Sequence, residues 1–142
     1  LFLEMLNHDF PWDTVQMPVN VFDPHFRSFQ KNVLPILLDR NIGVIAMKSL
    51  AGGHLMRIAA ATPAQALRYT WSQPVATIVS GMTTEEILRE NTRHARSFRP
   101  LTEQEQTDLL EKTKTYAQEG EYEPFKTTHE FDGPVGMKRH QT

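Results

Sequence analysis

Three short apolar segments alternate with amphipathic helical segments along the chain, and this alternation constrains the fold more than any other feature. Residues 13–22 place valines and a methionine at every second position, with Gln16 and Asn20 facing the other way, which predicts a strand. Residues 42–47 and 75–80 are short apolar runs, typical of strands buried on both faces of a parallel sheet. Strands that alternate with helices predict an α/β fold built on a parallel sheet.

Capping signals mark the helices that follow these strands. Three segments combine an N-cap Thr with a Glu or Gln three residues later, which is the pattern of a capping box: TPAQ at 62–65, TTEE at 83–86 and TEQE at 102–105. They predict helices over 63–72, 84–94 and 102–118. The segment 28–40 also has a helical apolar face, and Pro35 inside it predicts a kink.

The predicted sheet is incomplete. Three strands buried on both faces can neither cover nor close such a sheet, so we expect further chain or association with a second copy. The absence of an initiator Met before Leu1 fits the expectation of a fragment. Residues 120–142 show no clear periodicity and are predicted to form an irregular tail.

Composition excludes several classes of protein. The chain has 15 Lys and Arg against 17 Asp and Glu, a net charge of −2, which favours neither nucleic acid nor an anionic membrane as partner. No apolar run approaches the roughly 18 residues that cross a bilayer, and the first residues do not form a signal peptide. The absence of cysteine excludes thiolate chemistry and is in keeping with a cytoplasmic location. The six histidines lack metal-ligand spacing, so no metal site is predicted.

The loops that leave the predicted strands are the candidate binding elements, because ligands of parallel α/β folds lie at the carboxyl ends of strands. The loop 49–53 contains a Gly-Gly pair and small residues that let backbone approach an anion. The loop 80–84 leads directly into a predicted helix N-terminus. A plain turn is the alternative interpretation of the Gly-Gly pair.

Four segments together resemble the aldo/keto reductases. VQMPVNVFD at 15–23, GVIAMKSLAGG at 43–53 and VSGMTTEEILREN at 79–91 are similar, in order and spacing, to the last three βα units of that family, and EPFKTTHEFDG at 123–133 resembles a tail of its bacterial members. The resemblance implies that residues 1–101 are the C-terminal part of a (β/α)₈ TIM barrel. It also implies that residues 102–142 are a C-terminal helix and tail packed on the barrel.

The resemblance assigns cofactor contacts near the first two strands. Gln16 matches a glutamine whose amide binds the nicotinamide carboxamide, and a barrel-lining Gln is the alternative. Met47 stands where many members have a tyrosine that stacks on the nicotinamide, so a thioether would replace an aromatic face, unless Met47 is a core residue. Lys48, Ser49 and Leu50 occupy the positions of a Ser-Pro-Leu segment beside the pyrophosphate, with a surface lysine as the alternative for Lys48.

The last motif carries the other implied contacts. Gly81 and Met82 match the start of the family's phosphate loop, and Thr83 offers a hydroxyl there, although a helix cap explains Thr83 equally well. Glu90 and Asn91 match a Glu-Asn pair beside the adenine.

The resemblance implies NADP or NAD as the cofactor and favours NADP on family grounds. Ile87 stands where members that prefer NADP often have Arg or Gln, which leaves this choice open. Arg89 or Arg93 on a neighbouring turn are the remaining candidates for the 2′-phosphate.

The implied activity is NAD(P)H-dependent reduction of an aldehyde or ketone to an alcohol by an oxidoreductase of which this chain is a part. The family's catalytic tyrosine, lysine, aspartate and histidine come from the first half of the barrel, and none of those motifs occurs here. This chain therefore lacks the catalytic tetrad, and we expect it to associate with the missing N-terminal half or with another copy.

Two alternatives remain open. One is a non-catalytic barrel remnant that serves as a nucleotide-binding or assembly module, and the other is a generic βα domain without a nucleotide site. A tetrad-bearing region directly upstream in the gene would favour the enzyme, whereas a start codon just before Leu1 would favour the remnant.

Overall fold

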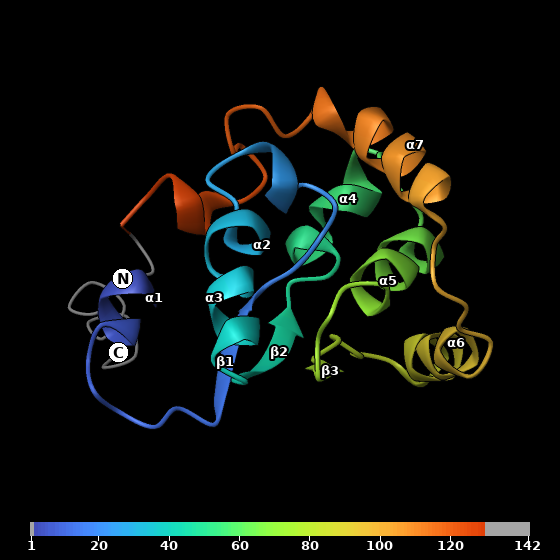
Figure 1. The fold of residues 1–142 in the computed structure, drawn as a ribbon. Coiled ribbons are helices and arrows are strands. Elements are labelled where there is room, and N and C mark those ends of the chain that lie inside the picture. Colours follow the sequence, from blue (N-terminus) through green and yellow to red (C-terminus); the bar gives the residue numbers. More distant parts are fainter. Residues whose placement is uncertain (1, 130–142) are drawn as a thin grey trace, which may run out of the picture.

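The computed structural model describes residues 2–129 (Figure 1). In chain order its elements, with η for a 3₁₀ helix, are α1 (Phe2–Leu6), β1 (Thr14–Pro18), η1 (Asp23–His25), α2 (Phe29–Asn32), α3 (Leu34–Asp39), β2 (Gly43–Met47), η2 (Ala51–Gly53), α4 (His54–Arg57), α5 (Pro63–Trp71), β3 (Thr77–Ile78), α6 (Glu85–Arg96), α7 (Glu103–Lys114) and η3 (Pro124–Lys126). The chain is thus an α/β protein.

The three predicted strands form one parallel sheet in the order β1-β2-β3. Gln16 pairs with Ile45, and Ile45 pairs with Thr77, so their side chains share one face of the sheet. The prediction of adjacent parallel strands is confirmed. Their carboxyl ends consequently meet at one edge, where the loops that follow β2 and β3 begin.

The strands are shorter than predicted. The first was expected to run to residue 22, but β1 ends at Pro18 because the Oδ1 atom of Asn20 accepts hydrogen bonds from the backbone N–H groups of Phe22 (2.8 Å) and Asp23 (3.2 Å). These two bonds turn the chain away from the sheet. The third strand was expected over 75–80, but β3 is only Thr77–Ile78, a short edge strand.

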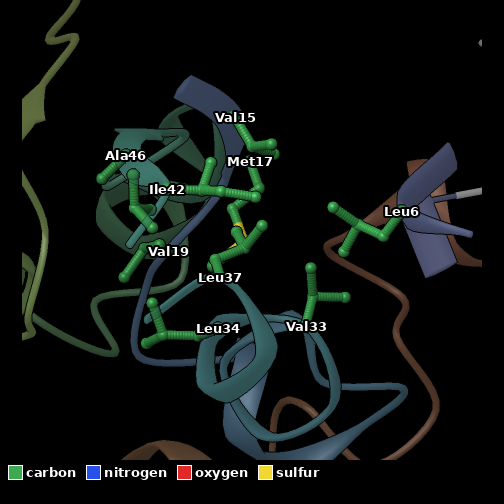
Figure 2. Packing of buried hydrophobic residues seen from close by; sticks show 10 residues of the cluster. Leu6, Val15, Met17, Val19, Val33, Leu34, Leu37, Ile42 and Ala46 are labelled. Atoms are coloured by element: carbon green, nitrogen blue, oxygen red, sulfur yellow. The ribbon is translucent and has the colours of Figure 1, made fainter. Parts of the chain in front are cut away.

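The helices of this chain cover one face of the sheet, which fits the expectation that this chain alone cannot cover its strands on both faces. Val15 and Met17 are buried, whereas Gln16 between them is exposed. Figure 2 shows Val15 and Met17 directed towards Leu37 of α3 within one apolar cluster. On the opposite face Gln16 and Thr77 are exposed, whereas Ile45 and Met47 are half-buried.

A second apolar cluster lies beyond the carboxyl edge of the sheet and joins α4, α5 and α7. Phe22, Leu55, Ala66 and Tyr69 are each at most 1% exposed in it, and Leu109 ties α7 to the same cluster. This second cluster fixes α4 and α5 in place behind the loop that leaves β2.

The helix predicted over 28–40 is two helices, α2 and α3, separated by Val33. Ser28 caps α2 by accepting a hydrogen bond from the N–H group of Lys31. Pro35 lies in the first turn of α3, where a missing N–H group costs nothing. Pro35 therefore starts a second helix and does not kink one long helix.

Two of the three predicted capping boxes are confirmed, at Thr62 before α5 and Thr102 before α7. The third was placed one residue too early. Thr84, not Thr83, caps α6, and its hydroxyl accepts from the N–H group of Ile87 (3.2 Å). The residue three places after this cap is Ile87, so α6 has a capped start without a capping box.

Two helices in the structure were not predicted from the sequence, and one predicted helix ends earlier than expected. The short helices α1 and α4 were not predicted, and α7 ends at Lys114 instead of near residue 118. The expected irregular tail contains η3, which lies beside the β1 exit (Figure 1). The part of that prediction on residues 130–142 lies outside the described residues.

Candidate functional site

The loops that leave β2 and β3 line one cavity together with α6. Its volume is about 570 Å³, within the range of roughly 300–1,000 Å³ that small-molecule sites occupy. The lining residues are Lys48, Ser49, Leu50, Gly52, Gly53, Met56, Pro63, Val79, Gly81, Thr83, Ile87, Glu90 and Asn91. Seven of the ten residues predicted for the cofactor site are therefore brought together.

The loop after β2 follows a tight path. Lys48 and Ala51 have positive φ angles of 56° and 48°, and the next two residues, Gly52 and Gly53, are also left-handed at 65° and 89°. The N–H group of Ala51 donates to the carbonyl of Lys48 (2.7 Å). Backbone strain of this kind gathers at binding loops, and here it leaves Lys48 exposed at the cavity wall.

Ser49 and Asn91 place buried polar atoms at the cavity. Ser49 is 3% exposed and Asn91 is 8% exposed. The Nδ2 atom of Asn91 donates to the Oγ atom of Ser80 (3.0 Å), which orients the amide. Among the described residues, nothing donates to the Oδ1 atom of Asn91, so this acceptor is available to a ligand.

Thr83 does not cap α6, although the sequence was compatible with that role. Because Thr84 caps α6, the exposed hydroxyl of Thr83 is not used at the helix start, and Thr83 lines the cavity. Gly81 lies at the same wall, and a Cβ atom built there would meet nothing within 4 Å. The start of the loop after β3 is thus open to a ligand.

Gln16 of β1 and Met47 of β2 do not line the cavity. They lie on the same face of the sheet as Thr77. The Nε2 atom of Gln16 is 3.5 Å from the sulfur of Met47, so the two side chains form one pair. Met47 directly precedes Lys48, which links this pair to the cavity through the chain. Met82 was predicted to belong to the site, but it is 49% exposed and does not line the cavity.

The charged side chains that line the cavity, within the described chain, are Lys48 and Glu90. His54 lies behind the loop, where burial and the neighbouring Arg57 lower the pKa of its imidazole. Its ring packs against that of Tyr122, with centroids 5.5 Å apart. The lining includes no tyrosine or histidine among residues 2–129, and no group of three His, Asp or Glu side chains there is arranged to hold a metal ion.

A buried charged cluster at the β1 exit was missed by sequence reasoning. The ammonium group of Lys126 lies 2.7 Å from Oδ1 of Asp23 and 2.7 Å from Oε2 of Glu123, and all three side chains are at most 1% exposed. Asn20 completes the cluster by donating from Nδ2 to Oε1 of Glu123 (3.0 Å). The spacing of Glu123 and Lys126, three residues apart, was the only signal in the sequence.

This cluster holds the segment after α7 against η1. Arg27 adds a hydrogen bond from Nη1 to the carbonyl of Lys126 (2.8 Å). Asp23 also accepts from Ser28 and from two N–H groups at the start of α2. The cluster is therefore structural, and it fixes the loop that follows β1.

No family model, no curated protein and no solved structure matches this chain. Among the described residues, none of the helices is both long and apolar enough to span a membrane.

Proposed function

We propose that this chain is the C-terminal part of an NAD(P)H-dependent, aldo/keto reductase-like oxidoreductase and supplies its nucleotide-binding loops. One observation carries the proposal: Lys48, Ser49, Thr83 and Asn91, which come from the two strand exits and α6, face a single cavity of about 570 Å³. Residues that the sequence resemblance assigned to one cofactor are thus neighbours in space although they span 44 positions of the chain.

The chemistry of the lining fits one half of a dinucleotide. Lys48 and the hydroxyls of Ser49 and Thr83 suit phosphate oxygens, which accept hydrogen bonds and carry negative charge. The free Oδ1 atom of Asn91 suits an amino group such as that of adenine. Leu50, together with the other apolar lining residues Met56, Pro63, Val79 and Ile87, gives the flat faces of a base an apolar surface.

The other half of the dinucleotide would lie along the exposed face of the sheet. Gln16 offers both a donor and an acceptor for a carboxamide, and the Met47 sulfur beside it offers a polarizable contact. The bound cofactor supplies hydride for reduction of a carbonyl compound. The residues of this chain hold and orient that cofactor; the proton donor is expected from a part of the barrel outside this chain.

The open sheet supports association. Among the described residues, β1 and β3 each have one edge without a partner strand, and the face with Gln16 and Thr77 is uncovered. Unpaired edges of parallel strands favour further strands, as a closed (β/α)₈ barrel provides. The missing N-terminal half or a second copy would complete such a barrel.

A second candidate is a non-catalytic module that binds nucleotide or serves in assembly. The observation that favours it is the lining of the cavity, where the described residues include no tyrosine or histidine. Joining the chain to a tetrad-bearing N-terminal half distinguishes the two: carbonyl reduction supports the enzyme, and binding without reduction supports the module.

Substitution of Asn91 with alanine tests the proposed site. We expect Asn91→Ala to weaken binding of NAD and NADP by about 1–2 kcal/mol, roughly 5–30-fold, because one buried polar partner is lost. Calorimetric titration of each nucleotide into the 142-residue chain measures this change. Asn32→Ala on the exposed side of α2 is the matched control and should bind like the parent. Unchanged affinity in a folded Asn91→Ala chain, or no nucleotide binding by the parent chain, would contradict the proposal.

A further inference from the structure

Helix α6 has little of the chain packed on it. Asn91 is the one buried residue among the twelve of α6, whereas α5 buries four of its nine. Figure 1 shows α6 at the edge of the molecule, where α5 is its neighbour. Much of the remaining surface of α6 is exposed to solvent, including Leu88, which is 47% exposed. Among residues 2–129, no element therefore covers the side of α6 that lies opposite Asn91.

Two neighbouring grooves form this outer face of α6, and they share Arg89 and Arg93. The first groove also holds Glu85, Glu86 and Glu90, and the second also holds Leu88, Thr92 and Arg96. The acidic residues Glu85 and Glu86 lie in the first turn of the helix, and the basic residues Arg93 and Arg96 lie in the last. Charge is thus separated along the outer face, from negative at its start to positive at its end.

The helix dipole alone favours this order of charges. It does not explain the like charges on adjacent turns, where Glu86 precedes Glu90 by four residues and Arg89 precedes Arg93 by four. Pairs of like charge at this spacing destabilise a solvated helix. In the described part of the chain, Glu86, Arg93 and Arg96 take part in no ion pair. A partner that brings the opposite charges to this face would therefore stabilise α6.

The spacing of the outer residues fits lengthwise packing of two helices. Four of them recur at the contact spacing of such a pair, i, i+4, i+7 and i+11: Glu85, Arg89, Thr92 and Arg96. In an antiparallel pair of identical helices, Glu85 of each copy lies opposite Arg96 of the other. Glu86 then lies opposite Arg93 on one side of the contact. On the other side, the exposed Leu88 lies opposite Ala95, so that apolar residues meet there.

We infer that α6 is a self-association surface on which two copies of this chain pair in antiparallel orientation. A second copy is the partner because α6 itself carries both halves of the complementary charge pattern. A parallel pair would place glutamates against glutamates and arginines against arginines, whereas an antiparallel pair also opposes the two helix dipoles favourably. Pairing of α6 does not depend on nucleotide binding, because Ile87 and Asn91 on the cavity side of the helix take no part in it.

Analytical ultracentrifugation of the 142-residue chain tests this pairing. One helix pair makes a small interface, so we expect a reversible dimer whose affinity comes mainly from charge. The dissociation constant should rise about tenfold between about 0.1 M and about 1 M salt, because the Debye length falls from about 10 Å to about 3 Å. A chain that stays monomeric at low salt and high concentration, or a dimer that salt does not weaken, would overturn the inference.

Charge reversal assigns the dimer to α6. Glu85→Arg combined with Glu86→Arg leaves only arginines at both ends of the outer face, and Arg93→Glu combined with Arg96→Glu leaves glutamates there. Each double variant alone should dimerise at least about tenfold more weakly than the parent, because like charges then face each other. An equimolar mixture of the two should associate at least as tightly as the parent. Recovery in the mixture also shows that each variant is folded.

The matched control makes the same kinds of substitution on α7. Glu103→Arg combined with Lys112→Glu changes one exposed residue of each sign and should dimerise like the parent. Dimerisation that persists in both α6 variants would place the interface elsewhere, as on the uncovered face of the sheet, and would overturn the inference. Loss of dimerisation in the α7 control, or a mixture that stays monomeric, would overturn it as well.

Discussion

Replacing Lys126 with methionine is expected to lower the free energy of unfolding by about 3–5 kcal/mol, because it leaves two buried carboxylates without their shared cation. The side chain of Lys126 is 1% exposed, and its ammonium group lies 2.7 Å from carboxylate oxygens of both Asp23 and Glu123. Methionine matches the length of the lysine stem, so lost packing contributes little. Urea unfolding followed by circular dichroism at pH 7 measures the change.

The loss should grow with pH. Burial raises the pKa of the Glu123 carboxyl, and Lys126 opposes that rise. Because the folded chain binds this proton more tightly than the unfolded chain, the contribution of Glu123 to stability falls as pH rises from the ordinary carboxyl range through its raised pKa. Without Lys126, ionising the buried Glu123 carboxyl costs more free energy. Lys126→Met should therefore lose more stability at pH 8 than at pH 5.

Lys114→Met is the matched control for Lys126→Met. Lys114 also pairs with a glutamate three residues away, Glu111 at 3.3 Å, but both side chains are more than half exposed. Exposed ion pairs contribute about 0–1 kcal/mol, so this variant should unfold close to the parent. Equal unfolding midpoints for Lys126→Met and the parent chain would mean that the buried charged cluster does not hold the segment after α7 against η1.

Gly120→Ala is expected to destabilise the chain by about 2–4 kcal/mol. Gly120 has φ +69°, a left-handed conformation that costs an L residue about 1–2 kcal/mol. A Cβ atom there would lie 2.6 Å from the ring of Phe26, and overpacking of that kind costs about 1–3 kcal/mol. The clash would push the segment carrying Glu123 away from η1. Thermal and urea unfolding of the purified variant measure the loss.

Gly81→Ala separates this effect from the general cost of replacing a glycine. Gly81 has no positive φ, and a Cβ atom there meets nothing within 4 Å. Its replacement should leave stability within about 1 kcal/mol of the parent, or raise it slightly by restricting the unfolded chain. Similar losses in both variants would refute the specific contact between residue 120 and Phe26.

The features that the sequence predicted well depend on local patterns. Each cap at Thr62 and Thr102 is formed within four consecutive residues, so the local sequence alone reveals it. The parallel sheet followed from the order of apolar and helical segments. The cap at Thr84 was missed by one residue because two adjacent threonines precede the helix, and only the backbone angles distinguish them.

The features that the sequence did not predict depend on partners far away in the chain. Lys126 and Glu123 stand in a polar segment that resembles a solvated tail, and their burial arises from Asp23, about 100 positions earlier. Asn20 was expected on the same side as Gln16, but it is buried because Glu123 reaches it. Within the site, the residues that line the cavity follow the strand exits, which are predictable, whereas the absence of Met82 from the lining is not.

Assignment of backbone resonances during titration with NAD tests the central claim most directly, namely that the two strand-exit loops and α6 form one nucleotide site. Nucleotide binding at this site should give saturable shifts at Lys48, Ser49, Gly52, Gly53, Gly81, Thr83, Ile87 and Asn91, with smaller shifts at Gln16 and Met47. The separate cavity lined by Trp71, His94 and Phe98, between α5 and the carboxyl end of α6, is an internal control and should not respond. Shifts centred on that control cavity, or a spectrum unchanged by saturating NAD, would contradict a nucleotide site formed by the two loops and α6.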